Sequence, residues 1–213
     1  MQILIFDNEQ DWLAARLGKV TGTRLKDIVV KRGTGKKIGF YELIAERIGS
    51  PADGENPMER GLRLEEDAIA RFEAKTEKKV ERERVIWVRD DDNNIAVSPD
   101  GVVVGKNKKK IGDSRRIEEA VEIKCLGSAR HIEAYLTQEV PDEYKMQVLQ
   151  YFIVNEDLKK LNLCFYDPRL RVRDFFILEL TREAVQGEID AMLEYQRTTL
   201  KEVEEIVDKL LSF

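Results

Sequence analysis

The chain has 213 residues, with 36 Lys and Arg against 41 Asp and Glu, and a net charge of −5. This length favours a single domain spanning residues 1–213, and the charge differs from that of a protein that coats nucleic acid, which would be basic overall. The two cysteines, Cys125 and Cys164, exclude a four-cysteine metal cluster and suggest a reducing compartment.

The first half of the chain has mainly helical patterns, with N-cap and glycine stop signals and one loop rich in Gly and Pro. These segments cover residues 7–18, 21–33, 40–49, 50–57 (the loop) and 58–76. Segments rich in β-formers follow, at residues 80–90, 94–105 and 118–125. The rest predicts a helix at residues 142–155, strands at residues 160–168 and 174–181, and a helix at residues 181–211. The last helix is expected to be broken near residues 197–199. This order indicates an α/β (α+β) fold with a central mixed β-sheet flanked by helices.

The segment VEIKC at residues 121–125 contains the first candidates for chemistry. Side chains of a strand alternate between its faces, so Glu122 and Lys124 share one face. A solvated Glu/Lys pair is the common alternative. Asp100 lies in the turn SPDG, where proline and glycine let the chain bend and direct the aspartate toward the next strand. An aspartate that only serves the turn is the alternative here.

Glu65 is the third acid, and it lies on the apolar stripe of the helix at residues 58–76, whereas Glu66 lies at the flank. A carboxylate on a buried face needs a partner or a cation; a slightly rotated helix with Glu65 at the rim is the alternative. Three carboxylates and a lysine would suit a hard cation such as Mg²⁺, which keeps several waters. Such a site would hydrolyse a phosphodiester, with the lysine holding and deprotonating the attacking water.

The Asp–x(n)–Glu–x–Lys arrangement resembles the PD-(D/E)XK nuclease superfamily, with SPD and EIK as its two halves. Further segments resemble, in the same order, the lambda-exonuclease (YqaJ-like) viral recombinase family; they are WLAARLGKVTGTRL, RGLRLEEDAIARFE, SPDG, EIKC, EYKMQVLQYFIV and FYDPRL. The resemblance covers roughly residues 10–180. It implies a restriction-endonuclease-like core and an exonuclease that depends on Mg²⁺, with Mn²⁺ as a substitute. The implied reaction degrades one strand of linear double-stranded DNA 5′→3′ to 5′-mononucleotides and leaves 3′ overhangs for phage-type recombination.

The resemblance also implies a catalytic and metal-binding set, which comprises Glu65, Asp100, Glu122, Lys124, Gln147 and the carbonyl of Ile123. Asp100, Glu122 and Ile123 match metal ligands of the family, and Glu65 matches a metal-proximal acid on a helix. Lys124 matches the catalytic lysine.

Two further parts of the resemblance concern the attacking water and the segments outside the predicted site. Gln147 matches the glutamine that helps to place the water, and Gln150 is the alternative because the spacing in QVLQYF is one residue longer than usual. Asp90 lies where relatives often carry another acid. The basic loop at residues 106–116 would follow the DNA backbone, and a solvated hairpin tip is the alternative.

A pocket for the 5′-phosphate is implied as well, formed by Arg16, Thr23, Ser98 and Arg130. The residues themselves support part of it, because TGTRL opens a helix and helix N-termini attract anions, and Arg16 has the fork geometry that grips phosphate. An ordinary N-cap threonine and a surface arginine are the alternatives.

The resemblance implies double-stranded DNA ends as the partner, a homo-oligomer such as a trimeric ring, and a single-strand annealing protein. No apolar run approaches the ~20 residues of a membrane span, and the first residues lack the basic start of a signal peptide. We therefore expect no membrane partner and a cytoplasmic location, in the host cell if the chain is phage-encoded. A structure-specific or endonucleolytic enzyme on the same core and a DNA-end-binding protein without activity are the alternative functions.

Overall fold

The computed structural model describes residues 57–82, 87–104 and 116–211, together with Asp11, Ile38, Tyr41, Ile44 and Ala45. The described helices are α4 (Pro57–Thr76), α5 (Ser128–Thr137), α6 (Asp142–Val154) and α7 (Arg182–Leu211). The strands are β1 (Lys79–Glu81), β2 (Trp87–Arg89), β3 (Asp92–Val97), β4 (Gly101–Val104), β5 (Glu119–Lys124), β6 (Lys160–Tyr166) and β7 (Phe175–Thr181). The chain divides into two compact units: unit 1 comprises residues 1–64, 124–139 and 165–176, and unit 2 comprises residues 65–123, 140–164 and 177–213.

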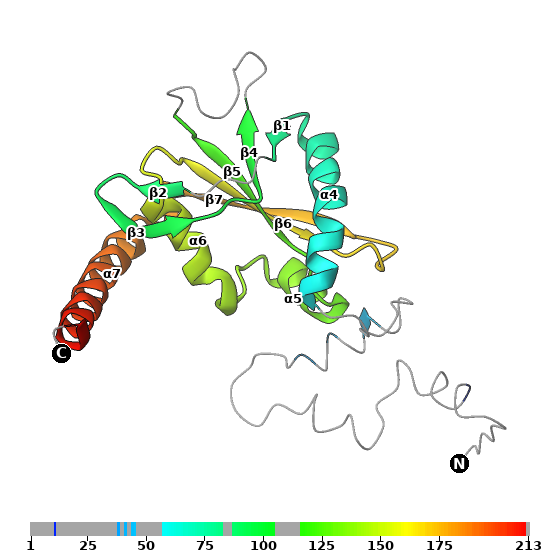
Figure 1. The fold of residues 1–213 in the computed structure, drawn as a ribbon. Helices are drawn as coiled ribbons and strands as arrows, with labels where there is room; N and C mark the ends of the chain where they lie inside the picture. The colour runs from blue at the N-terminus through cyan, green and yellow to red at the C-terminus, as the bar shows by residue number, and fades with distance from the viewer. Residues whose placement is uncertain are drawn as a thin grey trace. The chain divides into compact units, whose positions relative to one another are not determined.

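A five-stranded mixed sheet has the order β1-β4-β5-β6-β7 (Figure 1). β4 is antiparallel to both of its neighbours, with Gly101 opposite Val121 of β5. The beginnings of β5 and β6 lie together, since the backbone N–H of Lys160 donates to the carbonyl of Glu118 at 3.1 Å. The segment between these strands contains α5 and α6, as a crossover between parallel strands requires. β7 returns beside β6 after a short turn at residues 167–174. The fold is thus the expected mixed α/β architecture.

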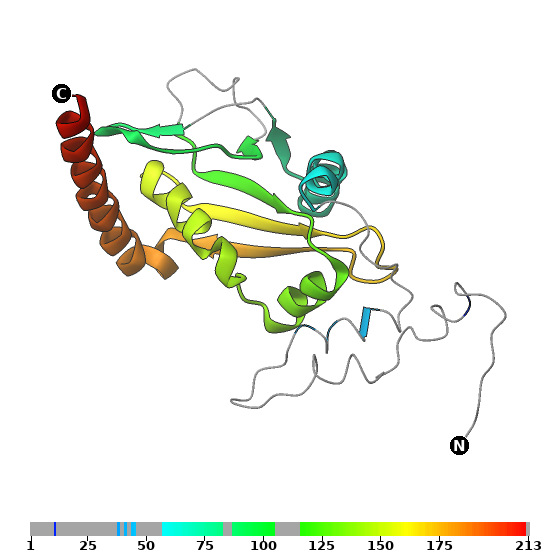
Figure 2. The same cartoon turned by 60° about the horizontal axis from the view of Figure 1, so that its bottom comes forward.

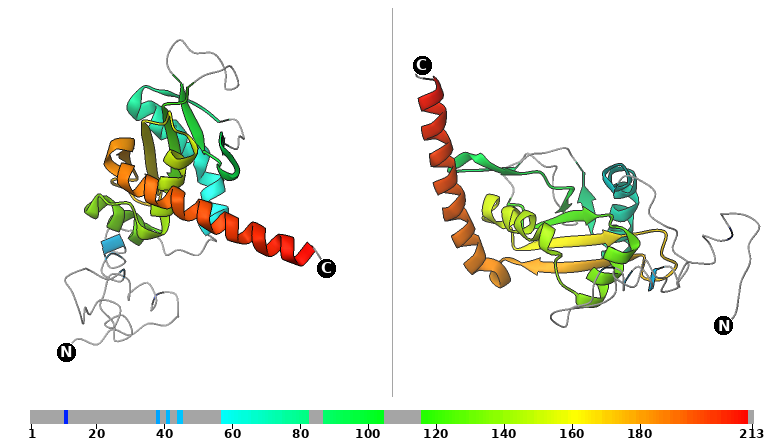
Figure 3. Two further views of the ribbon diagram at one scale, coloured as in Figure 1. Left: turned by 90° about the vertical axis from the view of Figure 1, so that its left-hand side faces the viewer. Right: turned by 90° about the horizontal axis from the view of Figure 1, so that it is seen from below.

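Unit 2 has its core between the sheet and the helices. Ala68, Ile69 and Phe72 recur on one face of α4 and are buried, as the apolar stripe of this helix predicted. The C-terminal half of α6, from Val148 to Val154, is buried almost completely. The first part of α7 runs beside α6 (Figure 2), and the C-terminal end of α7 projects beyond α6 (Figure 3). The C-terminal half of α6 is therefore enclosed, whereas Met146 in its N-terminal half is exposed.

Unit 1 contains a smaller apolar cluster around α5, formed by Tyr41, Ala45, Ile132 and Leu170. His131 is fully buried and packs edge-on against Phe176, with ring centroids 5.0 Å apart. Its Nε2 lies 2.8 Å from the carbonyl of Arg173, so this nitrogen carries the proton.

Three features differ from the sequence expectations. α5 was not predicted, because its N-cap Gly127 has no capping side chain and its first turn has no acid, so the usual start signals are missing. The break near residues 197–199 is wrong, because α7 is continuous; Thr199 Oγ1 donates to the Tyr195 carbonyl at 2.9 Å and so fits within the helix. The segment at residues 80–90 contains two strands, β1 and β2, rather than one.

Both cysteines are free thiols, as their number suggested, and burial raises the pKa of the Cys164 thiol well above its ordinary value. Among the helices of the described part of the chain, none has the length and apolar character to span a membrane.

Candidate active site

The turn between β3 and β4 brings Asp100 into contact with β5. Asp100 Oδ2 accepts a hydrogen bond from the backbone N–H of Ile123 at 2.7 Å. Gly101, the next residue, lies opposite Val121 in the sheet. The carboxylate of Asp100 is thereby fixed to the peptide that links Glu122 and Ile123. The expected meeting of the SPDG turn with the VEIKC strand is present.

Gly101 is required at this turn because there is no space for a side chain. A Cβ atom at this position would overlap Val80 Cγ1 of β1 and lie 3.7 Å from Ile69 Cδ1 of α4. The sequence suggested that the glycine was needed for unusual backbone angles, but close approach of β1 and α4 is the reason that the structure gives. The position of Asp100 thus depends on the absence of a side chain at its neighbour.

Glu122 is buried, with 3 % of its surface exposed, and α6 supplies a donor to each of its oxygens. Gln147 Nε2 donates to Glu122 Oε1 at 2.7 Å, and the hydroxyl of Tyr151 donates to Glu122 Oε2. Residues four apart on a helix lie on one face, so the two donors come from successive turns. The alternative of a solvated Glu/Lys pair is therefore wrong for Glu122.

Tyr151 is the residue of this site that sequence reasoning missed. It is fully buried, its ring packs edge-on against Trp87 with centroids 6.0 Å apart, and its hydroxyl lies 3.2 Å from the carbonyl of Ser98. Burial, followed by the negative charge of Glu122, raises the pKa of Tyr151 well above its ordinary value, so the hydroxyl remains a donor. Its spacing of four residues from Gln147 predicts that the two share one face of a helix, but not that Tyr151 binds Glu122.

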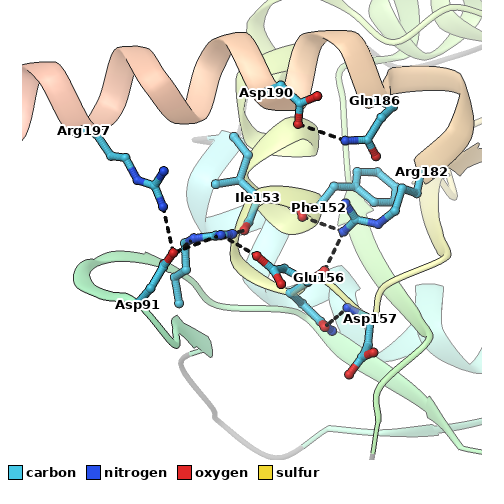
Figure 4. A network of polar contacts seen from close by, with 11 residues as sticks. Asp91, Phe152, Ile153, Glu156, Asp157, Arg182, Gln186, Asp190 and Arg197 are labelled. Atoms are coloured by element: carbon cyan, nitrogen blue, oxygen red, sulfur yellow. Dashed lines mark hydrogen bonds and ion pairs between the residues drawn. The ribbon is translucent and has the colours of Figure 1, made fainter.

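The C-terminal end of α6 is held by two arginines from other elements (Figure 4). Arg182 of α7 donates to the carbonyls of Phe152 at 2.6 Å and Asn155 at 2.7 Å. Arg89 of β2 donates to the carbonyl of Ile153. The last carbonyls of a helix lack partners within the helix, so these contacts satisfy α6 and fix its position.

Glu65 is half-buried on α4, and Ile69, which packs near Gly101, lies one turn later on the same face. However, the described residues contain no group of three or more His, Cys, Asp or Glu side chains that could hold a metal ion. The expected cluster of three carboxylates is thus not formed among them. Asp100 lies beside the backbone of Glu122 because β4 and β5 are paired, whereas Glu65 comes from a helix that approaches the turn through Ile69.

Lys124 is the last residue of β5 and is half-buried; by strand alternation it extends from the same face as Glu122. Of the two candidate glutamines, the structure places Gln147 at Glu122. Gln150 instead donates to the carbonyl of Ala96 at 3.2 Å and accepts from Gln196 at 2.8 Å. Gln150 therefore connects β3 and α7 through these two contacts.

The residues expected to bind the 5′-phosphate are only partly described. Arg16 and Thr23 lie outside the described residues. Ser98 is exposed at the start of the SPDG turn, and Arg130 is exposed in the first turn of α5, 2.8 Å from Glu133. The N-cap residue of α5 is Gly127, which makes no side-chain cap.

Two other residue groups were singled out from the sequence. Asp90 is exposed in the turn between β2 and β3. Of the basic loop at residues 106–116, only Arg116 is described, and its Nε lies 3.7 Å from Asp157 Oδ1 at the surface.

The donor set fits a hard divalent cation. Asp100 and Glu122 provide carboxylate oxygens, and Ile123, whose N–H binds Asp100, provides its own backbone carbonyl. Oxygen ligands of this kind suit Mg²⁺, for which one or two carboxylates suffice when substrate phosphate and water complete the shell.

The chain matches the YqaJ-like viral recombinase domain over residues 11–157, a range that includes all the site residues named above. A search of curated proteins found no match. Among solved structures, the chain is similar to an alkaline exonuclease from Laribacter hongkongensis, with 26% identity and a TM-score of 0.59 over 96% of this chain and 98% of that one. The structure of the same exonuclease in complex with dAMP matches with 27% identity and a TM-score of 0.55, over 95% and 100% of the two chains. The chain belongs to the YqaJ-like viral recombinase domain family.

Proposed function

We propose that the chain is a Mg²⁺-dependent exonuclease that degrades one strand of linear double-stranded DNA in the 5′→3′ direction. The products would be 5′-mononucleotides and duplexes with 3′ single-stranded overhangs, which serve homologous recombination of the phage type. At the coarser level, the family and the similarity to an alkaline exonuclease make the chain a nuclease of the lambda-exonuclease type. The complex of that exonuclease with dAMP supports a mononucleotide product.

The observation that carries the proposal is the contact between Asp100 and the Glu122–Ile123 peptide, 2.7 Å in length. It joins the carboxylate of Asp100 to the backbone beside Glu122, which lies 22 residues further along the sequence. The donors on α6 hold the carboxylate of Glu122 in a buried position. A protein that only binds DNA ends has no need of such a pair, because two carboxylates repel phosphate.

The roles of the residues follow from their chemistry. Asp100, Glu122 and the carbonyl of Ile123 would hold the cation, with Glu65 nearby on α4. When bound, Mg²⁺ would polarise the scissile phosphate and stabilise the charge that develops on it. Lys124 would hold and deprotonate the attacking water.

Gln147 has a place beside the same carboxylate. As a donor to Glu122, it would position this residue and, through it, the water. Gln147 is therefore expected to influence catalysis by orientation rather than by accepting a proton.

The 5′-phosphate would be bound by Arg16, Thr23, Ser98 and Arg130. Support for this comes from the position of Arg130 in the first turn of α5, because the dipole at a helix N-terminus favours anions. Recognition of a 5′-phosphate would set the direction of degradation.

The same proposal includes four further points: an oligomer such as a trimeric ring, an annealing protein as partner, Mn²⁺ as a substitute metal and a cytoplasmic location.

The direct test uses purified protein, Mg²⁺ and linear duplex DNA labelled at the 5′ or the 3′ end of one strand, with a 5′-phosphate or a 5′-hydroxyl. We expect early release of the 5′ label as a mononucleotide and faster degradation of the phosphorylated end. Lys124→Ala should abolish release while duplex binding changes by no more than about twofold. Absence of nucleotide release from every substrate would refute the proposal.

A structure-specific or endonucleolytic enzyme is the second candidate, because the same carboxylate pair serves either mode of cleavage. Covalently closed circular DNA separates the two. We expect the circle to remain intact; its nicking or linearisation would favour the endonuclease.

A further inference from the structure

Tyr151 makes a specific contact in the candidate site, and the proposed reaction assigns no role to it. Its hydroxyl donates to Glu122 Oε2, while Gln147 serves the other oxygen at 2.7 Å. A carboxylate with a fixed donor on each oxygen cannot rotate freely about its last bond. The remaining lone pairs of Glu122 then have fixed directions.

The ring of Tyr151 is as firmly placed as its hydroxyl. No part of the residue is exposed, and Trp87 packs edge-on against the ring at 6.0 Å. Further along α6, Arg182 and Arg89 bind the last carbonyls of the helix (Figure 4). Movement of Tyr151 away from Glu122 would therefore require rearrangement of the whole helix.

Tyr151 also contacts the segment that carries the other acid. Its hydroxyl lies 3.2 Å from the carbonyl of Ser98, two residues before Asp100. A phenol has one proton, and the carboxylate is the stronger acceptor, so the proton goes to Glu122 and the Ser98 carbonyl lies beside the same oxygen. Tyr151 is thus in contact with both chain segments whose carboxylates form the candidate metal site.

We propose that Tyr151 is a positioning residue, which orients Glu122 for binding the divalent cation. The inference rests on the proposed function, since it concerns the cation that Asp100 and Glu122 would hold. Partners that orient a ligand typically contribute 10–100-fold to metal affinity or activity. Tyr151 itself would contact neither the cation nor the DNA.

The test is Tyr151→Phe, which removes one oxygen and keeps the packing ring. We expect the dissociation constant for Mn²⁺, measured by loss of the free-ion EPR signal, to rise about tenfold or more. In nucleotide release, kcat should fall by a similar factor while KM for DNA ends stays within about twofold. Tyr166→Phe, the same change at another buried tyrosine, should leave Mn²⁺ affinity unchanged.

A double variant assigns the effect to Glu122. If Tyr151 acts through this carboxylate, Tyr151→Phe should have little further effect on Mn²⁺ affinity in a Glu122→Gln background. A merely structural tyrosine would instead lower the melting temperature and leave Mn²⁺ affinity of the folded protein unchanged, and this result would overturn the inference.

Two further outcomes are decisive. If Tyr151→Phe does not fold, a crystal structure of the wild-type chain with Mn²⁺ decides the matter: a Tyr151 hydroxyl that has left hydrogen-bonding range of Glu122 overturns the inference, and a retained contact supports it. If the wild-type chain neither binds Mn²⁺ nor releases nucleotides, the proposed function fails, and the role of Tyr151 fails with it. Binding by wild type together with unchanged binding by Tyr151→Phe refutes the role of Tyr151 alone.

Discussion

Gly101 shows how a single residue decides whether the two acids of the site can meet. Its neighbour Asp100 accepts a hydrogen bond from β5, and this contact needs β4 to begin directly against Val80 and α4. A larger residue would push these elements apart at the point where Asp100 is fixed. The glycine therefore has a steric role in the geometry of the candidate site.

Gly101→Ala is expected to destabilise the protein by about 1–3 kcal/mol, as overpacking typically does. The added Cβ overlaps Val80 Cγ1, and the β-branched Val80 has few rotamers with which to move away. Thermal and urea unfolding would measure the loss of stability. Weaker Mn²⁺ binding should accompany it because Asp100 is displaced.

Gly187→Ala is the matched control. Gly187 is exposed in α7, and a Cβ there would have no atom within 4 Å. Alanine in an exposed helix interior is more favourable than glycine by about 0.5–1 kcal/mol, so the control should be slightly stabilised with unchanged Mn²⁺ binding. Equal stability of the two variants would contradict the steric role of Gly101.

At the scale of the elements, α6 is the part of unit 2 that connects stability with the site. Its middle and last turns carry Gln147 and Tyr151, which bind Glu122. Its last carbonyls are bound by Arg182 and Arg89 (Figure 4). Because a helix is stiff, fixing the C-terminal end of α6 also fixes the position of Tyr151 in the same turn and of Gln147 one turn earlier.

Arg182→Ala should therefore lower the stability of the protein and disturb the geometry of the candidate site. Arg182 donates to three backbone carbonyls, at Phe152, Asn155 and Leu158. Loss of charged donors to such groups typically costs about 1.5–3 kcal/mol, and urea unfolding at neutral pH would detect it. We also expect weaker Mn²⁺ binding, since α6 carries Gln147 and Tyr151.

Arg197→Ala provides the comparison from the same helix. Arg197 is exposed and pairs with Asp91 at 2.7 Å (Figure 4), and exposed ion pairs contribute only about 0–1 kcal/mol. A loss of stability at Arg197 as large as that at Arg182 would argue against the carbonyl contacts as the cause.

The local pattern of apolar and polar residues was sufficient to predict most of the helices and strands that carry the candidate site. The stripe on α4, the alternation of β5 and the Pro–Gly turn before β4 all depend on neighbours in the sequence, and each of these elements is present. The pairing of Asp100 with the VEIKC strand could be anticipated because both segments are short and close in the chain. Family resemblance then gave Gln147 its place next to these acids.

Contacts between segments that are distant in the sequence could not be predicted from the local pattern of apolar and polar residues. Tyr151 lies in the apolar run YFIV and reads as an ordinary core residue, because periodicity identifies the buried face but not the partner across it. The same limit applies to Glu65: it is half-buried, and how deeply α4 packs against the sheet could not be deduced from the sequence. α5 lacks start signals altogether.

At the scale of the whole molecule, the net charge of −5 opposes the binding of DNA. The candidate site adds to this difficulty, because Asp100 and Glu122 present two carboxylates where a phosphate must come. A bound divalent cation would reverse the local charge. DNA binding and metal binding should therefore be coupled, and each should strengthen the other.

Removal of the metal should thus weaken DNA binding even when no cleavage takes place. For Lys124→Ala protein, which we expect to be inactive, the affinity for a duplex end should be about tenfold higher in Mg²⁺ than in EDTA, equivalent to about 1.4 kcal/mol. Fluorescence anisotropy with a labelled duplex would measure both values.

Charge substitutions show whether this coupling is local. Asp100→Asn, added to Lys124→Ala, should tighten binding in EDTA by several-fold and abolish the response to Mg²⁺, because it removes a repelling charge and a ligand together. Glu194→Gln changes the net charge by the same amount at an exposed position of α7 and should retain the response. If both substitutions act alike, overall charge governs DNA binding; if only Asp100→Asn acts, the carboxylate pair is where the cation and the phosphate meet.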